Sequence, residues 1–384
     1  MSSDKIYRYQ SVLLALLWLS GAVKPFLLNY IGSIDLTLIM MLLALLDMAL
    51  HYRNFSPNKD FIQGLILLFL FYSIMAVSLS YSPSYGYKYE KMVAFFANII
   101  YFLYPVFVKE VQLKSIVMTY LVVLIPTSIF FVSMTSILWS SGSDSVTAFM
   151  DLRSNYLSIG FNLGLLFLIL YHQKKILWLQ FLSFFLLIAS AARGALIFTI
   201  ALLVVDMFVR YSKKSEISWN SYFLSFTGLI GAILIFNQKI INFFSTSIRR
   251  FSSLAEGGDV SSAYRLEMME FAAFTPFSNH VNTLKMIFGY GIGSFGITFY
   301  DKDVRAYPHN IFLETFYELG LLGLVLFIMI KLRVLYSLRL KTSIFSLLYL
   351  FALLNAMKSG SLSDLWIYFS LASLVLLDKK YSWS

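Results

Sequence analysis

The sequence predicts an all-α membrane protein that crosses the bilayer about twelve times and carries one large loop outside it. Of its 384 residues, 59% are hydrophobic and 13% are charged, and the mean hydropathy is +0.75. So few charged residues cannot cover the surface of a water-soluble protein of this length. The apolar residues also come in blocks near the ~20 residues that a helix needs to cross a bilayer. These observations exclude a soluble globular protein.

Each long apolar block is expected to form a helix, because strands with unpaired backbone groups cannot lie in lipid. Short charged clusters separate the blocks. We expect one integral-membrane domain over residues 1–384. The predicted spans are 11–30, 33–50, 61–80, 92–108, 115–139, 155–171, 176–191, 194–210, 220–236, 309–330, 342–357 and 364–377.

The lysines and arginines of the short connections predict the orientation of the chain. With the N-terminus inside, the inner connections hold most of these residues and the short outer connections hold few. The positive-inside bias therefore puts both termini in the cytoplasm. The N-terminal residues lack the short apolar core and cleavage site of a signal peptide, so we expect the first helix to be retained.

One long segment, residues 237–308, is too polar to enter the bilayer and forms the predicted large loop between spans nine and ten. Its stretch YRLEMMEFAAF at 264–274 has apolar residues at helical spacing and ends before Pro276. We expect a short amphipathic helix there, lying on the outer face of the membrane. Long loops that mix apolar runs with turn signals are usually functional, so we interpret this one as a lid.

Composition limits the chemistry that is possible. The chain has no cysteine, which removes disulfides, thiolate metal sites and a cysteine nucleophile. Its net charge of +10 follows the membrane topology, so no nucleic-acid partner is expected. The four histidines lack metal-ligand spacing, and no cofactor is predicted. The pair Asp301 and Asp303 resembles a metal-holding DxD motif, but we favour a solvated acidic turn.

Arg193 is the first candidate site residue, in the segment ASAARGA at 189–195 between two strongly apolar blocks. A snorkelling arginine that anchors a helix end is the alternative. The small residues around it leave its side chain open to an anion, and guanidinium groups bind phosphate in bidentate geometry. The second candidate is Arg265, near the start of the predicted lid helix. It lies on the segment that could close over the membrane face.

The segment from 288 to 320 holds the third group of candidates. A glycine-rich stretch, FGYGIGSF at 288–295, is followed by YPHNIFLE at 307–314, where His309 marks the return to the membrane. Asn310, Glu314 and Tyr317 then fall on one helical face. Carboxylates inside a membrane are costly and need a partner or a cavity. A histidine at a helix start is often only a cap, but beside this polar stripe we interpret His309 as catalytic.

Together, the ordered motifs resemble the O-antigen polymerase and O-antigen ligase superfamily. They are the SAARGA turn, the long outer segment with Arg265, the FGYGIGSF loop, and YPHNIFLE followed by ELG. Their order and spacing match over about residues 190–330, and the twelve-span layout fits the rest. The turn has Ala192 where a serine is commoner in the family, a departure that should matter little.

The resemblance implies a GT-C-like fold and an inverting, metal-independent glycosyltransferase. Its implied substrates are undecaprenyl-diphosphate-linked oligosaccharides, as both donor and acceptor, at the periplasmic face of the bacterial inner membrane. By this analogy Arg193 and Arg265 hold the donor diphosphate, and His309 orients or deprotonates the acceptor hydroxyl. Arg153, Asn310, Glu314 and Tyr317 are assigned to substrate binding. Membrane lipid and a chain-length regulator protein are the expected partners.

Three functions remain open from the sequence. We favour an O-antigen polymerase, which acts in lipopolysaccharide biosynthesis. An O-antigen ligase would pass the same glycan to lipid A core. A lipid-linked glycan transporter or flippase would also suit twelve spans with both ends inside, but transporters normally have related halves, and the single large outer insertion makes this chain asymmetric.

Overall fold

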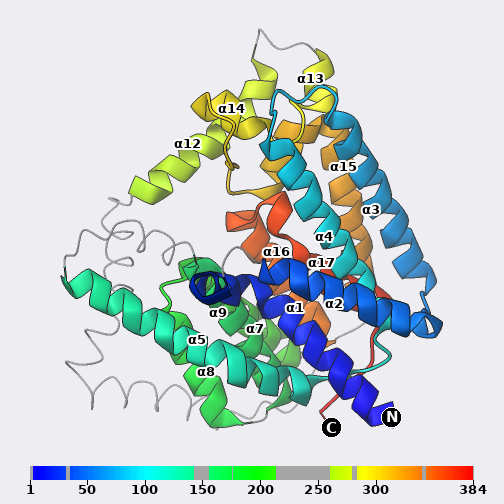
Figure 1. Ribbon diagram of the computed structural model, residues 1–384, viewed down its shortest axis with the longest axis vertical. Coiled ribbons are helices and arrows are strands. Elements are labelled where there is room, and N and C mark those ends of the chain that lie inside the picture. Colours follow the sequence, from blue (N-terminus) through cyan, green and yellow to red (C-terminus); the bar gives the residue numbers. More distant parts are fainter. Residues whose placement is uncertain are drawn as a thin grey trace. The chain divides into compact units, whose positions relative to one another are not determined.

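The computed structural model describes residues 3–31, 35–141, 155–174, 176–212, 260–278, 283–339 and 343–383. The described chain is built almost entirely from helices (Figure 1). Two short strands, Val111–Gln112 (β1) and Tyr381–Ser382 (β2), pair in parallel. The chain divides into two compact units. The first contains Met1–Met40, Val111–Asp259 and Tyr381–Ser384, and the second contains Met41–Glu110 and Val260–Lys380.

The first unit contains five helices with described bounds. In this unit α1 packs against α5, and α7 packs against α8. These helices are α1 (Ser3–Ile31), α5 (Leu113–Ser141), α7 (Tyr156–Gln173), α8 (Leu177–Ala189) and α9 (Arg193–Ser212). Helix α2 (Leu36–Leu50) runs across the boundary between the units.

The second unit contains more of the described helices than the first. In this unit α4 packs along α17, and α3 packs along α15. Its α-helices are α3 (Lys59–Ser78), α4 (Tyr87–Phe107), α12 (Val260–Phe274), α13 (Thr283–Phe288), α14 (Ser294–Tyr300), α15 (Ile311–Arg339), α16 (Ile344–Ser359) and α17 (Trp366–Leu377). Its short 3₁₀ helices are η1 (Tyr52–Asn54), η2 (Thr275–Phe277) and η3 (Leu362–Asp364).

Six of the described helices contain a stretch that is long and apolar enough to cross a membrane. They are α1, α3, α4, α5, α7 and α15. Shorter apolar helices α2, α8, α16 and α17 occupy four further predicted spans, and α9 occupies another. The predicted helical membrane class is thus confirmed in this coarser form. The number of twelve spans and the GT-C-like fold stay predictions, and the span predicted at 220–236 lies outside the described residues.

Helix α3 illustrates why a membrane suits these helices. Its first turn is capped by Asn58, whose Oδ1 accepts a hydrogen bond from the backbone N–H of Phe61 at 2.8 Å. One face is buried in the unit. The opposite face is also apolar, with Phe69 66% and Val77 65% exposed. Water would penalise an apolar stripe of this kind, whereas lipid chains would cover it.

The predicted amphipathic helix at 264–274 is confirmed as a helix. Helix α12 starts four residues earlier than predicted, at Val260, and ends at Phe274, where the 3₁₀ turn containing Pro276 begins. Its role as a lid stays a prediction, and the part of the loop at 237–259 lies outside the described residues. The assignment of the whole chain to one membrane domain also stays a prediction.

Candidate functional site

The start of α15 carries the motif YPHN and fixes where His309 lies. The Oδ1 of Asn310 accepts hydrogen bonds from the backbone N–H groups of Phe312 at 2.9 Å and Leu313 at 3.1 Å, so Asn310 caps the helix. The helix therefore begins at Ile311, two residues after the predicted start. His309 stands just before the cap with a φ of 56°, a left-handed conformation that non-glycine residues rarely adopt. Strain of this kind is frequent at functional sites.

A kink in α15 joins the helix to the glycine-rich loop. Gly320 has non-helical torsions, with φ 65° and ψ −166°. The backbone carbonyls of Tyr317 and Glu318 instead accept hydrogen bonds from the N–H groups of Tyr290 and Gly291, each at 2.9 Å. A Cβ at Gly320 would lie 2.3 Å from the carbonyl oxygen of Ile287. The FGYGIGSF and ELG motifs thus need each other, because the two backbones touch.

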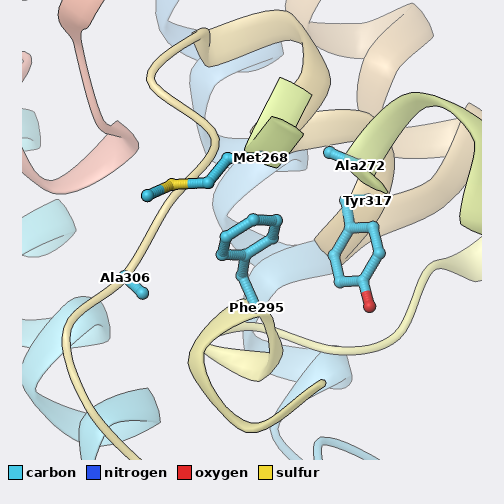
Figure 2. Close-up of a cluster of buried hydrophobic side chains, with 5 residues drawn as sticks. All are labelled: Met268, Ala272, Phe295, Ala306 and Tyr317. Atoms are coloured by element: carbon cyan, nitrogen blue, oxygen red, sulfur yellow. The ribbon is translucent and has the colours of Figure 1, made fainter. Parts of the chain in front are cut away.

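Helix α12 is held against α14 and α15 by a buried apolar cluster (Figure 2). Its members are Met268, Ala272, Phe295, Ala306 and Tyr317. Arg265 lies one turn before Met268 on α12, and His309 lies three residues after Ala306. The cluster therefore places the arginine-bearing turn of α12 beside the loop that carries His309.

Burial and charge keep the His309 imidazole neutral. Burial lowers its pKa from 6.5 to about 4, and the positive charge of Arg265 adds to the effect. The Nδ1 atom is buried and has no hydrogen-bond partner in the described part of the chain. The ring of Tyr307 lies 4.6 Å from the imidazole, centroid to centroid. A neutral ring with an unused nitrogen can accept a proton or a hydrogen bond from a hydroxyl.

A second arginine of the site, Arg305, lies on the loop that carries His309. The Nη2 of Arg305 is 2.5 Å from the Oδ2 of Asp364, the last residue of η3. This carboxylate raises the pKa of Arg305 further above its ordinary value, despite partial burial. The pKa of the Tyr307 hydroxyl is raised, chiefly by burial and then by the negative charge of Asp364. At neutral pH residues 305–309 therefore present one cation, Arg305, and two uncharged aromatic rings.

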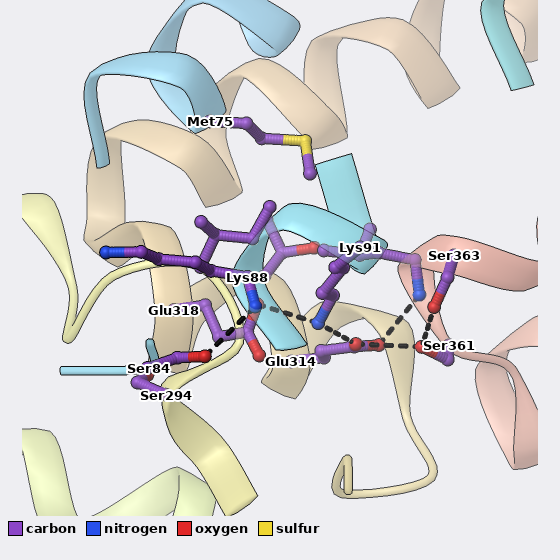
Figure 3. A network of polar contacts seen from close by, with 12 residues as sticks. Met75, Ser84, Lys88, Lys91, Ser294, Glu314, Glu318, Ser361 and Ser363 are labelled. Atoms are coloured by element: carbon purple, nitrogen blue, oxygen red, sulfur yellow. Dashed lines mark hydrogen bonds and ion pairs between the residues drawn. The ribbon is translucent and has the colours of Figure 1, made fainter. Parts of the chain in front are cut away.

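The first turns of α15 carry a fully buried ionic network (Figure 3). The ammonium group of Lys91, on α4, pairs with Glu314 and with the Oε2 of Glu318, the latter at 2.7 Å. The Oε1 of Glu314 also accepts a hydrogen bond from Ser361 at 2.9 Å, and its Oε2 accepts one from the N–H of Leu362 at 2.9 Å. The network ties the first turns of α15 to α4 and η3.

Lys91 is the important residue that the sequence analysis missed. The sequence does not single out Lys91, although it predicts that carboxylates inside the membrane need a partner or a cavity. Glu314 and Glu318 are four residues apart on one helix and therefore share a face. Two glutamates at that spacing inside an apolar helix were the signal that could have prompted a search for a buried cation.

Asp303 corrects the interpretation of the acidic turn. Asp301 is exposed, as expected, but both oxygens of Asp303 are engaged at the start of α4. They accept hydrogen bonds from the hydroxyl of Ser84 at 2.7 Å and from the backbone N–H of Gly86 at 2.6 Å. Burial favours the neutral acid, but these bonds outweigh it and hold the pKa of Asp303 below its ordinary value. Asp303 thus caps α4 from a distant loop.

The Arg193 turn belongs to the first unit. Ala191 has a φ of 58°, and its carbonyl accepts a hydrogen bond from the N–H of Arg193 at 3.0 Å, so the chain reverses tightly before α9. Ala191 and Ala192 are buried. A Cβ on Gly160 of α7 would lie 2.1 Å from the Cβ of Ala192, so the glycine is needed for the turn to pack on α7. The Arg193 side chain is partly exposed.

The remaining predicted residues have clear surroundings or lie outside the description. Glu314 is buried with both oxygens bonded, as described above. Tyr317 is buried in the apolar cluster, and its hydroxyl donates to the Oγ1 of Thr298 at 2.6 Å. Arg153 lies outside the described residues. The assignment of these side chains to substrate binding stays a prediction, and the described contacts of Glu314 and Tyr317 are with the protein itself.

Within the described residues, no group of three or more His, Asp or Glu side chains is arranged to hold a metal ion. The polar groups that come together at the start of α15 are instead two arginines, a neutral imidazole and a buried ionic support.

The segment that carries these features matches a known protein family. Residues 178–328 match the family model described as O-antigen ligase. This part of the chain is similar to the O-antigen ligase family. The predicted relationship to the O-antigen polymerase and ligase superfamily is thereby confirmed. No curated protein matches the chain.

The matched segment begins in α8 and ends in α15. It includes Arg193, Arg265, Arg305 and His309, together with the glycine-rich loop. Lys91 and Asp364, which support this loop from α4 and η3, lie outside the match. The family assignment is therefore carried by the segment that holds all three predicted catalytic residues.

Proposed function

We propose that this protein is a membrane glycosyltransferase of the O-antigen type, and specifically a surface-polysaccharide polymerase. It would join undecaprenyl-diphosphate-linked repeat units at the periplasmic face of the inner membrane. The observation that carries the proposal is the pairing of the Arg265 charge with the neutral His309 imidazole. The pair lies in a segment that matches the O-antigen ligase family.

The proposed reaction uses this pair in a single displacement. A hydroxyl oxygen of the acceptor sugar forms a bond to the anomeric carbon of the donor, and the bond from that carbon to the phosphate oxygen breaks. The undecaprenyl diphosphate leaves with the electron pair, and its developing charge is stabilised by guanidinium. His309 accepts the proton of the attacking hydroxyl. Attack from the face opposite the leaving group inverts the anomeric carbon.

Binding of the donor would also tune the base. In the free protein, Arg265 helps to keep the pKa of His309 near 4. A bound diphosphate would offset that positive charge and add negative charge, and both changes raise the pKa of a nearby imidazole. A histidine whose pKa rises toward the working pH becomes a better general base. Catalytic basicity would thus develop once the donor is in place.

Arg193 enters the proposal through its partly exposed position after a tight turn and through the family match. It would be a second ligand of the diphosphate, and Arg153 would assist. Asn310, Glu314 and Tyr317 would contribute to substrate binding mainly by fixing the start of α15. Membrane lipid, the two lipid-linked oligosaccharides and a chain-length regulator are the proposed partners, with both termini in the cytoplasm.

An O-antigen ligase is the second candidate, and the description of the matched family favours it. The two reactions share the donor and differ in the acceptor. Purified protein in nanodiscs should therefore be given lipid-linked repeat units alone. Ordered polysaccharide would support the polymerase. Product only after addition of lipid A core would replace the polymerase with the ligase.

A glycan transporter is the candidate from another class. Liposomes that carry the protein and a fluorescent lipid-linked glycan distinguish it, because a transporter moves the label across the bilayer without forming a glycosidic bond. Transfer of label with no new bond would refute the glycosyltransferase proposal.

Variants test the residues. Alanine at Arg193, Arg265 or His309 is expected to abolish polymer formation and to leave membrane insertion intact. Alanine at Lys302, an exposed residue of the same loop, is the matched control and should retain activity. Activity of any of the three variants at the wild-type level would remove that residue from the mechanism. Activity should also survive EDTA, since the oxygens of Asp303 already cap α4.

A further inference from the structure

Arg305 is a charged residue at the site to which the family resemblance assigned no role. Its side chain is 56% exposed, and that of its partner Asp364 is 32% exposed. An ion pair this accessible contributes little to stability, typically below about 1 kcal/mol, because water screens it. The pair is therefore labile, and its guanidinium group can exchange one anionic partner for another at small cost.

Arg305 and Arg265 both lie close in sequence to members of the same buried cluster. Ala306, the next residue, is buried in the cluster that also contains Met268, one turn beyond Arg265 on α12 (Figure 2). The two arginines thus lie next to members of one packed cluster. Both arginines also act on Tyr307. Burial raises the pKa of its hydroxyl, and the positive charges of Arg305 and Arg265 each lower it.

The loop is anchored independently of the ion pair. Asp303 bonds to the start of α4, Ala306 is buried in the apolar cluster, and Asn310 caps α15. Three attachments within eight residues hold the backbone on both sides of Arg305. The loop therefore does not need the exposed contact with Asp364 to keep its course, which leaves the guanidinium group available for another task.

A diphosphate suits this arrangement. It carries several negative charges on two adjacent groups, and an arginine binds such oxygens through two parallel N–H donors. We infer that Arg305 is a further ligand of the donor diphosphate, held ready by Asp364 and passed to a phosphate oxygen when the lipid-linked donor binds. This inference rests on the proposed function, because it assumes a lipid diphosphate as the donor group.

A purely structural role for the ion pair predicts a different pattern of variants. If the pair only held the loop, Arg305→Ala and Asp364→Asn would weaken donor binding alike. If Arg305 binds the diphosphate, Arg305→Ala weakens binding and Asp364→Asn strengthens it, because the competing carboxylate charge is removed. The double variant separates a direct contact from the simple loss of a nearby negative charge.

The experiment measures binding of undecaprenyl diphosphate to the full-length protein in nanodiscs. We expect Arg305→Ala to raise the Kd about tenfold, the loss of one charged contact of about 1.4 kcal/mol. Arg305→Lys should recover part of the loss, and Asp364→Asn should lower the Kd. In Arg305→Ala/Asp364→Asn the gain should disappear. Lys302→Ala is the matched control for charge on the same loop. The monophosphate lipid should show a smaller effect of every variant.

The outcomes separate the two levels of the argument. Wild-type protein that fails to bind the diphosphate would overturn the proposed donor, and this inference with it. Binding by the wild type that is unchanged in Arg305→Ala would overturn the inference alone. Equal weakening by Arg305→Ala and Asp364→Asn would assign the pair to loop structure, and a gain in Asp364→Asn that persists in the double variant would also exclude direct contact.

Discussion

Replacement of Lys91 by methionine should destabilise the second unit more than any surface substitution. Methionine has a similar length but no charge, so Glu314 and Glu318 would remain buried without their shared cation. Removing one partner of a buried ion pair typically costs about 3–5 kcal/mol, because the remaining charge keeps its desolvation penalty. Here two carboxylates lose their partner at once, so we expect at least the upper part of that range.

The assay is unfolding by SDS titration of the purified protein in mixed micelles, followed by tryptophan fluorescence. Lys88→Met is the matched control on the same helix, because the Lys88 ammonium is partly exposed and donates to the carbonyl of Leu79 at 3.2 Å. It should cost only about 1 kcal/mol. In the triple variant Lys91→Met/Glu314→Gln/Glu318→Gln the uncompensated charges are gone, so more than half of the lost stability should return. Equal effects of Lys91→Met and Lys88→Met, or no recovery in the triple variant, would refute the ionic network.

Four further predictions concern His309 and two glycines. As pH falls, kcat/KM should persist well below 6.5, because the pKa of the free His309 is about 4; the limb of kcat should lie at higher pH, since donor charge raises that pKa. Stability should also fall between pH 6.5 and 4, where the unfolded chain binds a proton that the folded chain does not. A wild-type limb of kcat/KM near 6.5 would contradict this assignment, as would a His309 pKa, followed by NMR titration, that Arg265→Met does not raise. Gly320→Ala should cost at least about 1–2 kcal/mol in SDS titration, from its left-handed φ and the contact with the Ile287 carbonyl, whereas Gly86→Ala, with its nearest contact at 3.4 Å, should be nearly neutral. Gly160→Ala should lower both stability and activity by displacing the Arg193 turn, and unchanged activity would separate that turn from function.

The helical class could be predicted from the sequence because lipid imposes one rule on every apolar block. Helix α12 was predicted for a similar reason, since its apolar spacing and Pro276 are local signals. The cap at Asn310 and the kink at Gly320 could not be predicted in detail. A polar side chain before a helix and a glycine within one each allow several local structures. At Gly320 the contact with the backbone of Ile287 and Gly289 decides between them.

Some of the site residues could likewise be predicted from local motifs, and others could not. His309 and Arg265 were singled out from their motifs, and the structure brings them within electrostatic reach of one another. Lys91 and Asp303 were not identified as supports, because their partners lie more than two hundred residues away along the chain. Sequence spacing reports neighbours on one helix, whereas these contacts depend on how α4 packs beside α15 and its preceding loop.

The most direct test of the account is a cryo-EM map of the protein bound to undecaprenyl diphosphate. We predict phosphate density against the guanidinium group of Arg265, with the imidazole of His309 facing the space that the acceptor sugar would occupy. Density for the diphosphate at a site without Arg265, or on the cytoplasmic side of the protein, would contradict the account.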